Sequence, residues 1–341
     1  MLIRCSFFIL RSSLFILLIC TLLHGESPYT LCIDGGGSKT LLQIIDHNAR
    51  VVFFTKNNAI TDATEAPGSN INTVGKDGLR ATLQKLFDGI VIDNHDLKKL
   101  LPTCDVIAGM AGITNPESKK IVAQVFQEFG IKKEKMMLLP DAELNLQLIE
   151  GDGIMLIAGT GSICLGKKNN TVYRVGGLGR ILGDEGSGYY IGLQAIKAAL
   201  AAEYGWGPAT SLSTHLKEFF TTPELKKIIL PLNLQEISPA LIAQIAPLVF
   251  QQAHAHDTVA QTIIEQAAHH LSFLITTMIA ITHLDGCEVQ LWGGVFKSEY
   301  ADAFIKKIEH YVFRNHTIKI INRARQNPAL LFAQKKQFLK N

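Results

Sequence analysis

The stretch 31–46, LCIDGGGSKTLLQIID, places the strongest constraint on the fold of this chain. Two apolar runs flank an acid, three glycines, a hydroxyl and a lysine, a pattern that predicts strand, tight turn and strand. Gly35, Gly36 and Gly37 lack a Cβ atom, so their N–H groups can approach a bulky anion, and Ser38 and Lys39 add side-chain donors. The pattern fits a polyphosphate-binding tip and fits an ordinary glycine-rich turn equally well.

Two better-known nucleotide motifs fail on spacing. A Walker-type loop requires Gly-Lys-Ser/Thr, whereas Gly37 is followed by Ser38. A dinucleotide fingerprint requires a third glycine where Thr40 stands, and a helix where the second apolar run lies.

A second stretch nearly repeats the first. Residues 154–167, IMLIAGTGSICLGK, again form an apolar run, a Gly-x-Gly-Ser turn and a second apolar run, about one domain's length further along the chain. Two such hairpins, one in each half, predict a duplicated domain with a nucleotide held between two lobes.

Composition narrows the class of protein. The 341 residues suffice for two domains, and 47% hydrophobic with 18% charged residues is typical of a globular protein. The net charge of +3 comes from scattered residues, which argues against nucleic-acid binding. Six cysteines contain no Cys-x-x-Cys pair, which argues against a disulfide framework, a zinc ribbon or a cysteine-ligated cluster and favours a reducing compartment.

The N-terminal segment is typical of an exported or membrane-anchored protein, which conflicts with the reducing compartment that the cysteines favour. Phe7 to Leu23 form an apolar run after Arg4, interrupted by Arg11, like a signal peptide or a short membrane anchor. The phosphate-type hairpin follows within a few residues, and its nucleotide is available in the cytoplasm. We therefore expect a cytoplasmic protein, with residues 1–28 an extension or a mis-assigned start, and membrane association only if that segment is retained.

The remaining pattern alternates strands and helices. Strands are predicted at 50–56, 106–110, 136–139, 288–292 and 317–321, with a polar loop at 61–70. Helices are predicted at 79–88, 116–130, 190–204, within 239–282, from Ser298 to about 313, and at 328–339.

Five motifs in order resemble one family. IDGGGSKT, LPDAELN, AGTGS, GGLGRILGDEGSGYYIG and WGGVFKS resemble the N-acetylglucosamine kinases and the wider BadF/BadG/BcrA/BcrD ATPase family, from about Leu31 to the C-terminus. The resemblance implies an α/β, two-lobed, actin-like (ribonuclease H-like) fold with a duplicated domain, ATP and Mg²⁺ in the interlobe cleft, and phosphorylation of an amino sugar at its 6-hydroxyl. It also implies an N-terminal lobe at 29–140, a C-terminal lobe at 141–325, and a closing helix at 326–341 that packs on the N-terminal lobe.

The resemblance assigns the reacting groups. Asp141 falls at the catalytic base, where a carboxylate would orient and deprotonate the sugar hydroxyl, and it could also cap the helix from Ala142. Asp34 would reach Mg²⁺ through water. The ATP phosphates would be bound by Gly36, Gly37, Ser38 and Lys39 from one lobe and by Thr160 and Gly161 from the other.

Sugar and adenosine contacts follow from the same comparison. Asn70, Asp141 and Asp184 match sugar-binding positions, and Leu178 with Gly179 stands where animal kinases carry tryptophan and glycine, which leaves the sugar open among N-acetylglucosamine, glucosamine and N-acetylmuramic acid. Glu185 is either a second sugar ligand or a helix cap. Gly293, Gly294 and Ser298 match the adenosine turn, with adenine expected near Phe296.

Two other functions compete with the kinase. An activator of a 2-hydroxyacyl-CoA dehydratase belongs to the same branch but needs paired cysteines for an iron–sulfur cluster. An actin-like, nucleotide-gated binding module would not need Asp141. The sequence does not decide whether the protein forms a homodimer, as its relatives often do. The histidines at 254, 256, 269 and 270 are interpreted as helix-surface residues, not metal ligands.

Overall fold

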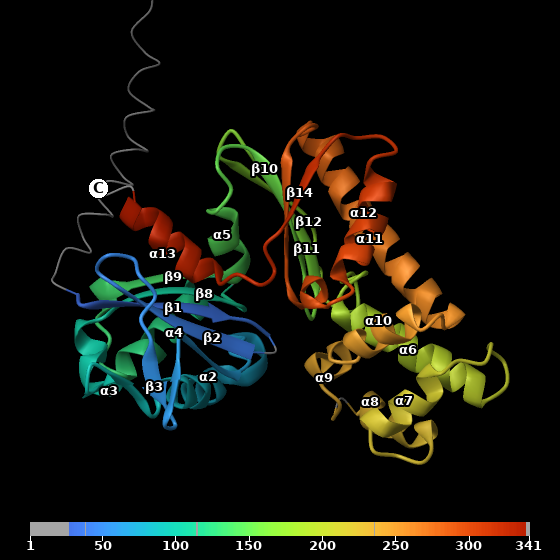
Figure 1. Ribbon diagram of the computed structural model, residues 1–341, viewed down its shortest axis with the longest axis horizontal. Helices are drawn as coiled ribbons and strands as arrows, with labels where there is room; N and C mark the ends of the chain where they lie inside the picture. Colours follow the sequence, from blue (N-terminus) through green and yellow to red (C-terminus); the bar gives the residue numbers. More distant parts are fainter. Residues whose placement is uncertain (1–26, 38, 114, 235, 339–341) are drawn as a thin grey trace, which may run out of the picture. The chain divides into compact units, whose positions relative to one another are not determined.

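The chain forms two compact units (Figure 1). The computed structural model describes residues 27–338 apart from positions 38, 114 and 235, so the apolar segment 7–23 lies outside the described residues. The first unit runs to Leu148 and takes back the chain from Asn327, and the second comprises Ile149–Gln326. Within the described part of the chain, no helix is long and apolar enough to cross a membrane.

The first unit is built on a five-stranded sheet of order β5-β2-β1-β8-β9. Strands β1 and β2 are the predicted hairpin and pair antiparallel, as do β2 and β5, whereas β1, β8 and β9 run parallel. The bounds are β1 Tyr29–Gly35, β2 Lys39–Asp46, β5 Ala63–Pro67, β8 Asp105–Met110 and β9 Met136–Pro140.

Helices cover both faces of this sheet. Leu31 and Ile33 of β1 point into a core shared with α2 and α4, while the intervening Cys32 packs with α5 and α13. Cys32 and the two residues beside it are fully buried, so the strand is covered on both sides. The bounds are α2 Ile71–Phe87, α3 Leu97–Leu100, α4 Pro116–Glu128, α5 Asp141–Leu146 and α13 Pro328–Phe338.

The second unit repeats the sheet of the first. Its order is β12-β11-β10-β13-β14, with the first three strands antiparallel and β10, β13 and β14 parallel. Counted along the chain, each sheet has the order third, second, first, fourth, fifth, with the same strand directions, so the predicted domain duplication is confirmed. The bounds are β10 Gly153–Ala158, β11 Ser162–Lys168, β12 Thr171–Gly176, β13 Glu288–Trp292 and β14 Lys319–Asn322.

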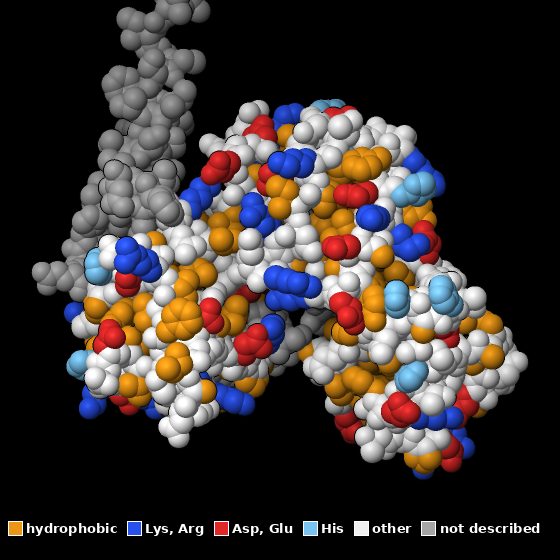
Figure 2. All heavy atoms as spheres, viewed as in Figure 1, with side chains coloured by type: hydrophobic (Ala, Val, Ile, Leu, Met, Phe, Trp, Pro, Cys, Tyr) orange, Lys and Arg blue, Asp and Glu red, His pale blue; other side chains and the backbone are white. Residues whose placement is uncertain are grey.

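Helices α6, α10, α11 and α12 share one large core with this sheet. The longest of these, α11, has Asp257 as its N-cap and His283, which has a left-handed backbone (φ 55°), as its C-cap. The bounds are α6 Gly188–Glu203, α7 Leu212–Phe219, α8 Ile229–Asn233, α9 Pro239–Ala243, α10 Ala246–His254, α11 Thr258–Thr282 and α12 Ala301–Val312. On the face in Figure 2, basic and acidic side chains are interspersed over both units.

The segment 50–78 differs from the prediction. Only Phe54–Lys56 (β3) of the expected strand is regular, and it joins a small sheet with β4 Ala59–Thr61, β6 Ile90–Ile92 and β7 His95–Asp96. The supposed polar loop contains β5, and α2 starts eight residues earlier than expected, with a kink at Gly75 (φ 66°). Strand β5 forms because it pairs with β2, which is distant in the sequence. The start of α2 was not predicted because Gly75 and Gly78, which are poor helix formers, interrupt its helical pattern.

Candidate functional site

Three strands of the first unit end together. In the ladder of parallel strands, Gly35 of β1 pairs with Met110 of β8, and Met110 pairs with Pro140 of β9. The carboxyl ends of parallel strands form one edge of a sheet, which is where α/β proteins place ligand-binding groups. Asp34, the glycine turn and Asp141 therefore meet at this edge, although they lie about a hundred residues apart in the chain.

The backbone of the first turn is held in place from several sides. The Gly36 N–H donates to the Lys39 carbonyl (2.9 Å), and the Gly36 carbonyl accepts from the Ser69 N–H (3.0 Å). Gly37 is exposed, and Ser38 lies outside the described residues. Lys39 makes an ion pair with Glu65 of β5, so its ammonium group is already engaged beside the turn.

Asn70 stands next to this turn and caps α2. Its side-chain oxygen accepts from the Asn72 N–H (3.0 Å), a role the sequence did not indicate. A Cβ atom on Gly112 would lie 2.3 Å from that oxygen, so the glycine makes room for the amide. The cap fixes the orientation of Asn70 and leaves its NH₂ group free to bind a hydroxyl.

Asp141 is the first residue of α5, which differs from the expected cap of a helix from Ala142. One carboxylate oxygen accepts from the Ala142 N–H (2.9 Å), so the second oxygen can meet a reactant. Burial raises the pKa of Asp141 above its ordinary value, against the opposing effect of the backbone hydrogen bonds. A carboxyl group with a raised pKa holds a proton more readily, which suits a base.

Two buried oxygens lack partners near the same edge. Ser69 Oγ and Asn145 Oδ1 are the buried side-chain polar atoms without a hydrogen bond among the described residues. Ser69 precedes Asn70, and Asn145 lies one helical turn after Asp141 on α5. Unsatisfied buried polar atoms cost about 1–3 kcal/mol each, and they concentrate where a structure serves a ligand.

The second unit carries its own turn. The Gly159 N–H donates to the Gly161 carbonyl (2.9 Å), which closes the tip between β10 and β11, and Thr160 is partly buried at its apex. Asp184 lies against this tip, because one of its carboxylate oxygens accepts from the Ser162 N–H (3.1 Å). Burial raises the pKa of Asp184, the Ser162 N–H opposes that rise, and nearby Glu185 adds to it.

The loop before Asp184 is exposed and apolar. Leu178 is 63% exposed, Ile181 83% and Leu182 75%, and Gly179 has a positive φ of 83°. Leu178, at the position matched to the tryptophan of the animal kinases, thus offers an aliphatic surface in place of an aromatic one. Glu185 is exposed and does not cap α6, since Ser187 does so through the Tyr190 N–H (3.1 Å).

A cavity of about 290 Å³ borders the expected adenosine turn. Gly293 has φ 104°, and a Cβ atom there would lie 2.3 Å from the Ala158 carbonyl, so the turn requires glycine. Phe296 is fully buried and packs on Phe304, so its ring offers no exposed face for stacking. Of the residues that line this cavity, only Phe296 and Ser298 were expected from the sequence; the full lining comprises Phe296, Ser298, Glu299, Ala301, Asp302, Asn322, Arg325 and Gln326.

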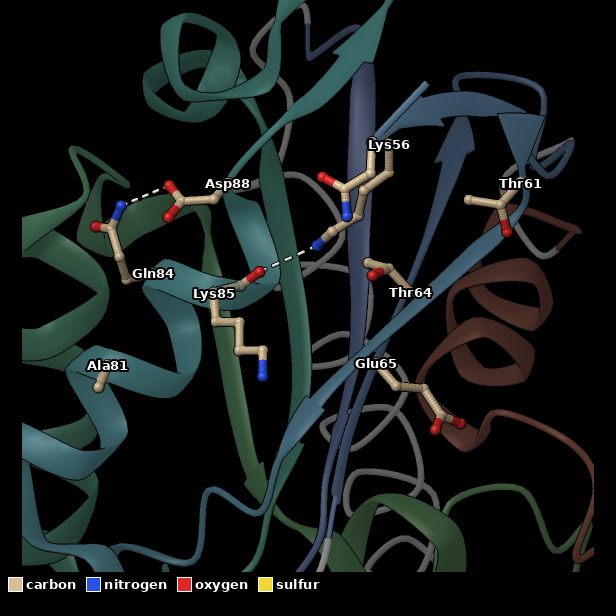
Figure 3. Close-up of a pocket in the computed structure, with 9 residues that line it drawn as sticks. Lys56, Thr61, Thr64, Glu65, Ala81, Gln84, Lys85 and Asp88 are labelled. Atoms are coloured by element: carbon tan, nitrogen blue, oxygen red, sulfur yellow. Dashed lines mark hydrogen bonds between the residues drawn. The ribbon is translucent and has the colours of Figure 1, made fainter. Parts of the chain in front are cut away.

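A larger cavity, about 620 Å³, lies elsewhere on the first unit (Figure 3). Lys56 donates to the Lys85 and Leu86 carbonyls (3.0 and 2.9 Å) and thereby caps the end of α2. Asp88 accepts from Gln84, as drawn, and Glu65 pairs with Lys39. Three of the charged side chains that line this cavity, Lys56, Glu65 and Asp88, are therefore engaged within the protein, and we assign the cavity no ligand.

Histidines and cysteines do not form a metal site in the part of the chain that the structure describes, where no group of three or more His, Cys, Asp or Glu could hold an ion. The His254 ring lies tilted against that of Tyr300, and the His270 ring meets that of Tyr190 edge to face, all within the second unit. Burial raises the pKa of the Cys104 thiol to about 12 and that of Cys287 to about 11. Cys104 is a core residue of the first unit, and Cys287 is partly buried against the core of the second.

Comparison with known proteins identifies the class. The sequence matches the BadF/BadG/BcrA/BcrD ATPase family over residues 31–330. A solved structure described as a candidate N-acetylglucosamine kinase from Chromobacterium violaceum superposes with a TM-score of 0.67 at 20% identity, covering 92% of this chain and 100% of that one. A ROK family glucokinase from Streptomyces griseus gives 0.53 at 14% identity, covering 90% and 98%. The fold is the duplicated, actin-like ATPase fold expected from the sequence.

The chain belongs to the BadF/BadG/BcrA/BcrD ATPase family. It is 32% identical over 277 residues to an N-acetylmuramic acid/N-acetylglucosamine kinase of Clostridium acetobutylicum, which covers 79% of this chain and 86% of that protein. It is 31% identical over 266 residues to an N-acetyl-D-glucosamine kinase of Dictyostelium discoideum, covering 74% and 80%.

Proposed function

We propose that this protein is an amino-sugar kinase that uses ATP to phosphorylate the 6-hydroxyl of N-acetylglucosamine or a close relative. The observation that carries the proposal is the position of Asp141. This partly buried carboxylate lies at the same edge of the sheet as the glycine turn and Asn70. The names of the two relatives above support an amino sugar as the acceptor.

Asp141 performs the proton transfer. Its free oxygen accepts the proton of the 6-hydroxyl while that hydroxyl oxygen forms a bond to the γ-phosphorus of ATP. The bond from the γ-phosphorus to the bridging oxygen breaks, and ADP leaves with the electron pair. The raised pKa of Asp141 makes its carboxylate a better proton acceptor.

The glycine turns provide donors for phosphate oxygens. Gly36, Gly37, Ser38 and Lys39 would act from the first unit, and Thr160 and Gly161 from the second. A phosphate bound by Lys39 would share its ammonium group with Glu65 or replace that carboxylate. Gly293, Gly294 and Ser298 would hold the adenosine, beside the smaller cavity.

Asp34 fits a magnesium ion held through water. Magnesium in phosphoryl-transfer sites takes one or two carboxylates, phosphates and several waters, so a single half-buried carboxylate next to a phosphate turn is sufficient. When bound, the ion would neutralise charge on the phosphates. Sugar hydroxyls would be held by Asn70, Asp184 and the backbone near Leu178 and Gly179.

The test is a direct assay of phosphate transfer. The protein is incubated with ATP, magnesium and, separately, N-acetylglucosamine, N-acetylmuramic acid, glucosamine and glucose, and product is detected by mass. We expect 6-phosphorylated amino sugar and little or no product from glucose. Absence of transfer to every amino sugar would refute the proposal.

A further inference from the structure

The second glycine turn and the loop 184–188 form one hydrogen-bonded structure. Besides the bond from the Ser162 N–H to Asp184, the Ser162 hydroxyl donates to the Glu185 carbonyl (2.8 Å). The Gly188 N–H donates to the Gly159 carbonyl (2.8 Å). The groups proposed for phosphate and for sugar are therefore fixed to each other within this unit.

Gly161 leaves no room for a side chain beside Asp184. A Cβ atom at position 161 would lie 2.8 Å from both carboxylate oxygens, closer than real Cβ contacts allow. The φ angle of Gly161 lies outside the left-handed region, so its backbone does not demand glycine. The space taken by the carboxylate is what excludes a side chain here.

We propose that Gly161 is a positioning residue for Asp184: its missing side chain sets where the carboxylate stands, and so decides how tightly the sugar is held. This inference rests on the proposed function, because it takes Asp184 as a ligand of the sugar hydroxyls. It makes a residue of the phosphate turn a determinant of sugar affinity.

The substitution Gly161→Ala tests it. The carboxylate ends a short side chain and can rotate away, so we expect the fold to survive and the bond to Ser162 to be lost. A carboxylate turned away from Ser162 would also lose its hydrogen bond to the sugar hydroxyl, and losing one well-placed charged hydrogen bond to a ligand weakens binding about tenfold or more. Calorimetry with N-acetylglucosamine and no nucleotide should show that rise in Kd.

Gly159→Ala is the matched control. Gly159 belongs to the same turn, also lacks a positive φ, and has no atom within 4 Å of a Cβ placed on it. We expect its sugar Kd to stay within about twofold of the wild type, since no contact to Asp184 changes. An unchanged Kd in Gly161→Ala, or an equal loss in both variants, would overturn the inference.

Failure of the proposed function would look different. In that case the wild-type protein itself binds and phosphorylates no amino sugar. The crystal structure of Gly161→Ala then decides the positioning role alone: a carboxylate turned away from the Ser162 N–H supports it, and an unmoved carboxylate refutes it.

Discussion

At Asp141 the ionised carboxylate needed for the proposed activity lowers the stability of the folded protein. Its folded pKa lies above the ordinary value, so folding favours the protonated form and is opposed by ionisation. Stability therefore falls as pH rises from the unfolded to the folded pKa, and the penalty is complete above both. We expect Asp141→Asn, which keeps an acceptor for the Ala142 N–H, to unfold at higher denaturant concentration at pH 7.

The same substitution should lower kcat by about 10²- to 10⁴-fold, because a general base contributes that much. In the wild type, kcat/KM should fall on acidification at a pH above the usual carboxyl range, as Asp141 takes up its proton. Glu143→Gln is the control, since Glu143 is exposed on the same helix. Full activity in Asp141→Asn would show that another group accepts the proton.

Single residues were predictable where a motif and a strand end coincide. Asp34 and Gly35 are the last residues of strand β1, and Asp141 follows Pro140 at the end of β9, so the local sequence was enough to place them at strand ends. The contact of Gly161 with Asp184 could not be found this way, since it joins two loops that only the folded chain brings together. The cap made by Asn70 was missed because Gly75 obscures the helix it begins.

At the scale of elements, helix α11 is held at its start by the N-cap residue Asp257. Asp257 caps it through the Ala260 N–H (2.9 Å) and also accepts from Thr210 Oγ1, Ser211 N and Ser211 Oγ. Burial alone would raise the pKa of Asp257, but these hydrogen bonds outweigh it and lower the pKa. We expect Asp257→Ala to cost about 2 kcal/mol in the free energy of unfolding, measured by urea titration.

The pH dependence supplies a second measurement. A lowered folded pKa gives stability that is present above the unfolded pKa and lost as pH falls through the folded one. The stability difference between wild type and Asp257→Ala should therefore shrink below about pH 4. Asp302→Ala, an exposed acid in the first turn of α12, should change little at any pH, and an equal loss there would contradict the argument.

Helices and strands were predictable where the residues that determine them lie within the element or directly beside it. The two hairpins and the helices 116–130 and 190–204 follow from period and turn residues close to what the structure shows. Strand β5 has five residues, only one of them buried, and exists because β2 offers an open edge. Non-local pairing of that kind leaves little trace in the segment itself.

At the level of the whole chain, each unit has its own sheet and core, but the first is not contiguous in sequence. Helix α13 crosses back from the C-terminus, and Ala329, Phe332 and Ala333 pack with Cys32 and its neighbours. Asn327 adds a buried hydrogen bond from its NH₂ group to the Cys32 carbonyl (3.3 Å). The first copy of the duplicated fold is therefore completed by a helix from the C-terminal end of the chain.

Deletion of the chain after Gln326 should therefore weaken the first unit and spare the second. Exposing one face of β1 and β8 removes several buried side chains from contact, each worth about 1.5–3 kcal/mol when large. Hydrogen exchange of the truncated protein should show faster exchange in β1, β2 and β8, with β10 and β13 unchanged. Gln334→Ala, which loses only its bond to the Ala49 carbonyl, is the mild control. Uniform loss of protection in both sheets would mean that the two units unfold together. Their cores would then not be independently stable, contrary to the prediction.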